Sequence, residues 1–137
     1  MKKKNLLELE IKNYFSKKQG IIAVYLFGSS AKGKEGHCSD IDIGILLDQE
    51  HRESIKTIIN NSIVELGRIL KRDIHPVILN SASEELLRQV FSYGICLLVN
   101  NPETLSRFKM VMYSRIADFS YYRNQMQSGL IKKVMKG

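Results

Sequence analysis

Residues 27–44 of the chain read FGSSAKGKEGHCSDIDIG, in which a Gly-Ser pair that starts at Gly28 is followed by ten residues and then by Asp40-x-Asp42. A short apolar run with β-branched and aromatic residues, 21–27, ends directly before Gly28, and a second such run, 41–47, begins between the two aspartates. Runs of this kind are typical of buried strands. Alternate residues of a strand share a face, so Asp40 and Asp42 project together while the isoleucines beside them turn toward the core. The stretch therefore predicts two strands joined by a loop, with two carboxylates where the second strand begins.

These residue types indicate a site for a divalent cation and a phosphate. Two carboxylates held side by side repel each other unless a cation lies between them, and oxygen ligands favour Mg²⁺ over softer metals. Gly28 lets the backbone approach a ligand closely, and Ser29 adds a hydroxyl donor at the predicted turn, where free backbone amides attract phosphate. Asp40 and Asp42 opposite this turn would suit metal-assisted displacement at a nucleoside triphosphate, which is nucleotidyl transfer.

The remainder of the sequence predicts alternating helices and strands within one domain over residues 1–137. No repeat, low-complexity tract or linker-like stretch interrupts the chain. Apolar residues at helical spacing and short apolar runs assign the elements. We expect helices over 5–18, 51–70, 83–91 and 103–131, and further strands over 73–79 and 95–99. Ser83 is expected to cap the third of these helices. The apolar stripe of the last helix suits packing on its own sheet or contact with a partner equally well.

Composition excludes several classes of protein. The net charge of +7 is uneven, because residues 1–20 carry +4, residues 21–106 carry −3 and residues 107–137 carry +6. An acidic centre between basic ends suits a cation site that attracts a polyanion. Cys38 and Cys96 lie far apart and have no neighbours at zinc-ligand spacing, so neither a disulfide framework nor a zinc site is indicated. No signal segment or membrane-spanning run is found, and we expect a cytoplasmic protein without membrane contact.

The signature resembles that of the DNA polymerase β-like nucleotidyltransferase superfamily. The fuller form, Gly-Ser-x-Ala-x-Gly ending in Ser-Asp-Ile-Asp, is similar to the minimal nucleotidyltransferases, the MNT family of the HEPN/MNT toxin-antitoxin pairs. The resemblance covers residues 20–80. It implies an α+β fold with a small mixed sheet flanked by helices and a long C-terminal helix. It also implies a two-magnesium site, with Gly28 and Ser29 on the triphosphate and Asp40 and Asp42 on the metal ions.

Two further positions are judged by the same resemblance. Ser30 stands where many relatives have arginine, which leaves one phosphate contact of the nucleotide-binding segment in doubt. Members of the superfamily also use a third carboxylate from a later strand, and Asp73 is the candidate for this metal-binding and catalytic role. Alternation places His75 on the same face as Asp73. The alternative is that Asp73 is a solvent-facing residue at the start of a strand whose Pro76 marks a sheet edge.

The resemblance implies that the chain transfers AMP from ATP, with Mg²⁺, onto a tyrosine of a cognate HEPN ribonuclease toxin and so acts as an antitoxin. One alternative is transfer of a nucleotide to a small hydroxyl compound, as in aminoglycoside-modifying relatives. Another is a non-catalytic module that masks a partner through its C-terminal helix. The basic tail has no motif that reads a nucleic-acid groove, so a nucleic-acid partner is not expected.

Overall fold

The computed structural model of the chain describes residues 3–28, 40–48, 50 and 55–117. By its internal contacts the chain divides into two compact units, Met1–Leu105 (unit 1) and Ser106–Gly137 (unit 2). The expected single domain over 1–137 stays a prediction.

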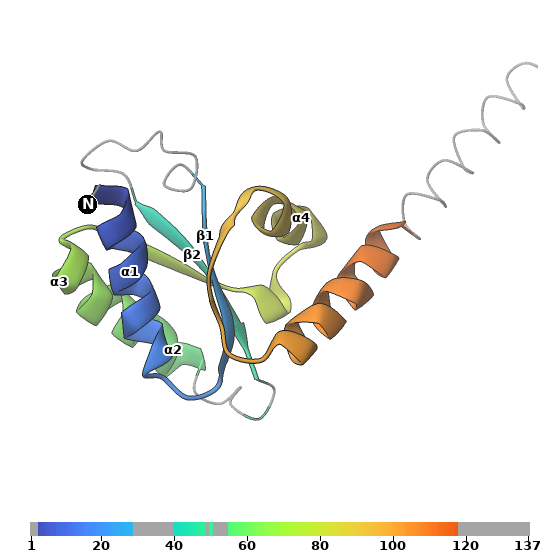
Figure 1. Cartoon of the computed structure of the whole chain (residues 1–137), viewed down its shortest axis with the longest axis horizontal. Helices are drawn as coiled ribbons and strands as arrows, with labels where there is room; N and C mark the ends of the chain where they lie inside the picture. Colours follow the sequence, from blue (N-terminus) through green and yellow to red (C-terminus); the bar gives the residue numbers. More distant parts are fainter. Residues whose placement is uncertain (1–2, 29–39, 49, 51–54, 118–137) are drawn as a thin grey trace, which may run out of the picture. The chain divides into compact units, whose positions relative to one another are not determined.

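A four-stranded mixed sheet forms the centre of the described part of unit 1 (Figure 1). Its strands stand in the order β3-β2-β1-β4. β1 pairs antiparallel with both β2 and β4, whereas β2 pairs parallel with β3. The strands are β1 (Ile21–Phe27), β2 (Ile41–Leu47), β3 (Ile74–Ile78) and β4 (Ile95–Val99). The predicted strands 21–27, 41–47 and 95–99 are confirmed. β3 is one residue shorter at each end than the predicted 73–79, and it is an edge strand, as Pro76 indicates.

Helices cover both faces of the sheet (Figure 1). The first face carries α1 and a helical segment that begins at α2, and the second face carries α4. Their bounds are α1 (Lys3–Ser16), α2 (Ile55–Asn61), the π-helical segment η2 (Ser62–Leu66), α3 (Gly67–Leu70) and α4 (Glu84–Tyr93). This arrangement confirms the predicted α+β fold, and the continuous apolar runs of β1 and β2 follow from burial on both sides.

The helices differ in detail from the expectation: α1 begins and ends two residues earlier than the predicted 5–18, and α4 begins one residue later and ends two residues later than the predicted 83–91. The predicted helix 51–70 is described from Ile55 onward, and its middle is π-helical rather than regular. The Ser62 hydroxyl donates to the Ile58 carbonyl over 2.6 Å, which engages the acceptor that a regular helix reserves for the Ser62 amide. In α4, Ser83 caps the first turn as predicted, because its Oγ accepts a hydrogen bond from the Leu86 amide over 3.2 Å.

The core lies mainly between the sheet and the helices on its first face. Ile11 and Phe15 of α1 and Leu66 of η2 are fully buried against apolar side chains of all four strands. On the second face, the ring of Tyr25 meets that of Phe91 edge-on, with centroids 5.1 Å apart. Full burial of these large side chains supplies most of the favourable free energy of folding, at about 25 cal/mol per Å² of apolar surface.

The last helix is described over residues 102–117, which covers the first half of the predicted helix 103–131; residues 118–131 lie outside the described part. In the portion that belongs to unit 2, Met110, Val111 and Tyr113 expose 70%, 48% and 44% of their surface. Within the described residues, no helix has the length and apolar character needed to cross a membrane.

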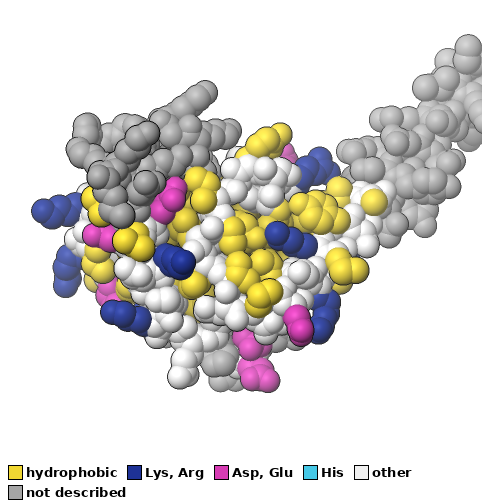
Figure 2. Space-filling view, in the orientation of Figure 1, with side chains coloured by type: hydrophobic (Ala, Val, Ile, Leu, Met, Phe, Trp, Pro, Cys, Tyr) yellow, Lys and Arg dark blue, Asp and Glu magenta, His cyan; other side chains and the backbone are white. Residues whose placement is uncertain are grey.

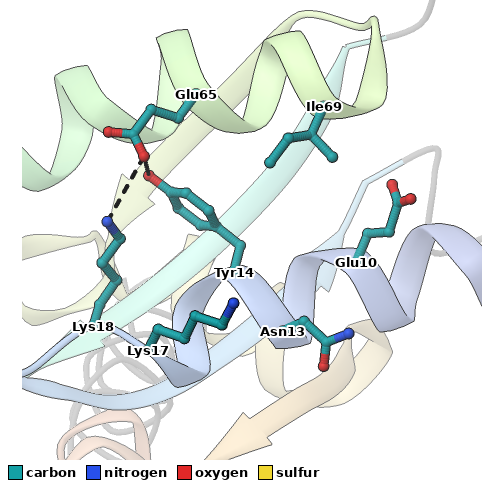
Figure 3. A pocket seen from close by; sticks show the side chains of 7 residues that line it. All are labelled: Glu10, Asn13, Tyr14, Lys17, Lys18, Glu65 and Ile69. Atoms are coloured by element: carbon teal, nitrogen blue, oxygen red, sulfur yellow. Dashed lines mark hydrogen bonds and ion pairs between the residues drawn. The ribbon is translucent and has the colours of Figure 1, made fainter.

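A tyrosine ties α1 to η2 on the first helical face (Figure 3). The Tyr14 hydroxyl donates to Glu65 Oε2 over 3.2 Å, and Lys18 Nζ lies 3.7 Å from the same oxygen. Lys18 Nζ also lies 4.9 Å from the centroid of the Tyr14 ring. Burial, and then the charge and hydrogen bond of Glu65, raise the pKa of Tyr14 to about 12 from its ordinary value of 10.0. The neutral tyrosine is therefore part of the packing between the two helices.

We predict that this contact makes the fold sensitive to alkali. Between the two pKa values the unfolded chain releases the Tyr14 proton while the folded chain keeps it, so the free energy of unfolding falls as pH rises from about 10 toward 12. Tyr14→Phe should lose less stability than the wild type over this interval, because no proton is released at that position. Urea denaturation followed by far-ultraviolet circular dichroism at several pH values measures the difference.

Tyr113→Phe is the matched control, since Tyr113 lies in unit 2 and is exposed. It should keep the wild-type pH dependence. Identical slopes for Tyr14→Phe and the wild type would show that Tyr14 ionises alike in the folded and unfolded chains.

Candidate active site

Polar site residues from three neighbouring strands meet at one edge of the sheet, the edge that the strand ends form. Because β1 runs antiparallel to β2 and β2 runs parallel to β3, the end of β1 lies beside the beginnings of the other two strands. In this register Phe27 stands opposite Asp42, and Asp42 stands opposite His75. Gly28, which follows β1, reaches the same edge. A glycine, a carboxylate and an imidazole thus come together from positions far apart in the sequence.

The two aspartates of the signature face away from the core, as strand alternation predicts. Ile41 and Ile43 are fully buried on the opposite side. Asp40 lies just before β2 and is exposed, whereas the Asp42 side chain, within the strand, exposes 26% of its surface. Both carboxylates are therefore reachable from solvent at the edge of the sheet, and Asp42 is the more constrained of the two.

Position 28 favours glycine for two reasons, its backbone conformation and the closeness of the Asp42 side chain. Its φ of +77° lies in the left-handed region that residues with a Cβ rarely adopt. A Cβ added at Gly28 would also collide with Oδ2 of Asp42. β1 ends directly before this glycine, and the Asp42 carboxylate occupies the space that a side chain would take. Ser29 and Ser30, the other predicted nucleotide-binding residues, lie outside the described residues.

His75 contacts Asp42 directly. Its Nδ1 lies 3.0 Å from Asp42 Oδ1, and its side chain is 67% exposed. Alternation placed His75 on the face of Asp73 near the predicted site, but the pairing with Asp42 follows only from the parallel register of β2 and β3. Sequence reasoning missed this contact, because one sequence does not reveal which strands are neighbours.

Asp73 lies directly before β3 and is exposed. Its carbonyl accepts a hydrogen bond from the Ile41 amide over 2.9 Å, so its backbone adjoins that of the Asp40–Ile41 segment. Among the residues that the structure describes, no group of three His, Cys, Asp or Glu side chains is arranged to hold a metal ion. The role of Asp73 as a third carboxylate stays a prediction.

The donors at this edge fit magnesium in kind. Mg²⁺ in proteins is usually held by one or two carboxylates, and its other positions are filled by water and by phosphate oxygens of a substrate. Asp40 and Asp42 supply such carboxylates, and both are accessible to solvent. A site of this composition can hold a metal-bound phosphate ester and does not need a third protein ligand to do so.

Comparisons with known proteins agree with this geometry. The family model described as polymerase beta, nucleotidyltransferase matches residues 9–103. A crystal structure of a toxin-antitoxin with AMP-PNP is 25% identical, with a TM-score of 0.64, and the match covers 90% of this chain and 98% of that one. No curated protein matches the chain significantly.

Two further structures are similar in fold. One is described as tri-AMPylated Shewanella oneidensis HEPN toxin in complex with MNT antitoxin, and its matching chain is 24% identical with a TM-score of 0.56. The other is the toxin-antitoxin MntA-HepT, also 24% identical, with a TM-score of 0.55. Each match covers 96% of this chain and 98% of the other. The family model spans well over half of the sequence and includes every residue of the edge described above, and the chain therefore belongs to the polymerase β nucleotidyltransferase family.

Proposed function

We propose that the chain is a magnesium-dependent nucleotidyltransferase that transfers AMP from ATP onto a tyrosine of a cognate HEPN toxin and thereby acts as an antitoxin. The observation that carries this proposal is the contact of Asp42 with Gly28, with Asp40 exposed directly before β2, within a chain of the nucleotidyltransferase family. The proposal assigns metal binding to Asp40, Asp42 and Asp73, and contact with the triphosphate to Gly28, Ser29 and Ser30.

The proposed reaction is a displacement at the α-phosphorus of ATP. The tyrosine hydroxyl oxygen forms a bond to this phosphorus, the bond from phosphorus to the bridging oxygen of the β-phosphate breaks, and pyrophosphate leaves. Bound Mg²⁺ would neutralise the phosphates and stabilise the pyrophosphate as it departs. Asp73 is placed in the proposal as the group that accepts the proton of the hydroxyl, since its backbone adjoins the Asp40–Ile41 segment.

A protein acceptor is supported by two observations. The similar structures are toxin-antitoxin complexes, and one of them contains a HEPN toxin described as tri-AMPylated. In this chain the helix over 102–117 exposes Met110, Val111 and Tyr113, and exposed apolar side chains of this kind are typical of interaction surfaces. Figure 2 shows exposed apolar side chains on the drawn face, with Lys and Arg side chains among and around them.

A masking antitoxin without chemistry is the second candidate, because exposed apolar residues would serve binding equally well. The two candidates differ in what they require of Asp40 and Asp42. Masking needs neither carboxylate, whereas transfer needs both. The substitutions below therefore separate these functions.

We predict that Asp40→Asn and Asp42→Asn each reduce AMP transfer by more than about 100-fold, because loss of a direct metal ligand should cost at least as much as loss of an outer partner of a ligand. The full chain is incubated with Mg²⁺, its co-purified partner and ATP labelled at the α-phosphate. Label on the partner is then quantified by gel and by intact mass.

Asp48→Asn is the control for loss of one negative charge. Asp48 follows β2 at the end of the strand remote from Asp40, where its amide donates to the Gly20 carbonyl. This variant should transfer AMP at the wild-type rate. Toxin neutralisation that survives Asp42→Asn, with no label on the partner in the wild type, would favour masking.

Gly28 supports the proposal because it leaves room for the carboxylate of Asp42. Any side chain at this position must compete with Asp42 Oδ2 for the same space. A substitution at Gly28 should therefore displace the Asp42 carboxylate from the proposed metal site without removing it. Gly20 is a matched position, since its φ is +81° and it lies before β1, at the other end of the same strand.

We predict that Gly20→Ala lowers the free energy of unfolding by about 1–2 kcal/mol, the cost of a left-handed conformation for a residue with a Cβ. Gly28→Ala should lower it by at least as much, because Asp42 Oδ2 must also move. Only Gly28→Ala should also reduce AMP transfer, because only there does the new methyl group displace the Asp42 carboxylate. Denaturation and the labelling assay measure the two effects. Equal transfer by the two variants would refute a functional role for the contact between Gly28 and Asp42.

A further inference from the structure

The two oxygens of the Asp42 carboxylate lie close to residues of the two neighbouring strands. Oδ1 lies 3.0 Å from His75 Nδ1 on β3, and Oδ2 lies against Gly28 at the end of β1. An ionised carboxylate only accepts hydrogen bonds, so the ring must donate from Nδ1. The hydrogen bond on one side and the backbone on the other leave the carboxylate little freedom to rotate.

The backbone of His75 is itself restrained. His75 stands directly opposite Asp42 in the parallel pairing of β2 with β3. Pro76 follows it, and the residue before a proline is confined to extended conformations. His75 therefore presents its ring from a fixed strand position although the ring is 67% exposed. At this exposure the ring contributes little to the packing of the core.

We propose that His75 is a positioning residue, which donates from Nδ1 to Asp42 Oδ1 and holds that carboxylate in the orientation needed to bind the metal ion. This inference rests on the proposed function. Partners that hydrogen-bond to a metal-binding side chain fix its orientation, and their loss typically costs about 10- to 100-fold in metal affinity. His75 acts through Asp42 and is not assigned contact with the nucleotide or with the acceptor.

The position of the donor suggests a set of three variants. Asn places an amide nitrogen close to where Nδ1 of His75 lies, so His75→Asn keeps the donor. Gln carries its amide one methylene further out, and Leu has no donor, so His75→Gln and His75→Leu remove the contact at Oδ1. None of these changes should unfold the chain, because the side chain is largely exposed at an edge strand. Thermal denaturation of each variant verifies this.

The measurement is the affinity of the full chain for Mn²⁺, by isothermal titration calorimetry, in saturating α,β-methylene ATP, whose carbon bridge prevents transfer. We expect His75→Leu and His75→Gln to weaken Mn²⁺ binding by about 10- to 100-fold and His75→Asn to bind close to the wild-type affinity. Equal affinity in all variants would overturn the inference, and so would an equal loss in all three, which would indicate that the imidazole itself is a ligand.

Two controls separate this inference from the proposed function. If the wild type binds no Mn²⁺ and Asp42→Asn changes nothing, the proposed metal site fails as a whole. If the wild type binds Mn²⁺ and Asp42→Asn abolishes binding, only the His75 variants decide the role of His75. Nitrogen-15 spectra of the metal-free chain, with the ring neutral, should show the proton of His75 on Nδ1; a proton on Nε2 alone would contradict the donation.

Discussion

The register of three adjacent strands is the constraint on which the candidate site depends. Phe27 must stand opposite Asp42, and Asp42 opposite His75, for the glycine, the carboxylate and the imidazole to meet. A slip of one residue would turn Asp42 into the core and bring Ile41 to the surface. Ile41 and Ile43 are fully buried, so the hydrophobic effect that stabilises the fold also selects this register. Stability and site geometry thus have the same physical origin.

Much of the fold could be predicted from local pattern, because short runs of mainly apolar, strand-type residues bounded by glycine or by polar residues assign the four strands, although β3 is interrupted by His75 and Pro76. Pairing could not be predicted, since nothing in one sequence states that β2 lies between β1 and β3. The contact of His75 with Asp42 depends on that pairing. The π-helical turn at Ser62 could not be predicted either, because the apolar spacing of 51–70 is that of an ordinary helix. The Ser62 hydroxyl competes with the helix backbone for the Ile58 carbonyl, and the apolar pattern does not reveal this hydrogen bond. Among the candidate site residues, alternation correctly placed Asp42 away from the core.

Gly28 shows how one residue can serve the fold and the site together. Its positive φ lets the chain leave β1 at the sheet edge, and its missing side chain provides the space that Asp42 Oδ2 occupies. The two requirements point to the same residue for independent reasons, one of backbone sterics and one of close approach. A Gly-Ser pair alone is an ordinary turn, but its distance in sequence from Asp-x-Asp and the closeness of Gly28 to Asp42 make the glycine part of one arrangement.

The family match and the division into two units place the candidate site and the exposed C-terminal helix in different parts of the chain. The match ends at residue 103, and the first compact unit ends at Leu105, so the edge with Asp40, Asp42 and His75 lies wholly within the shared part. Residues 107–137 carry a net charge of +6 and lie beyond it. Chemistry that depends on a strand register is constrained by the whole sheet, whereas an exposed helix with Met110 and Tyr113 can change its surface residues without disturbing that register. Under the proposed function, the sheet would therefore determine the reaction, and the segment after it would determine which partner is modified.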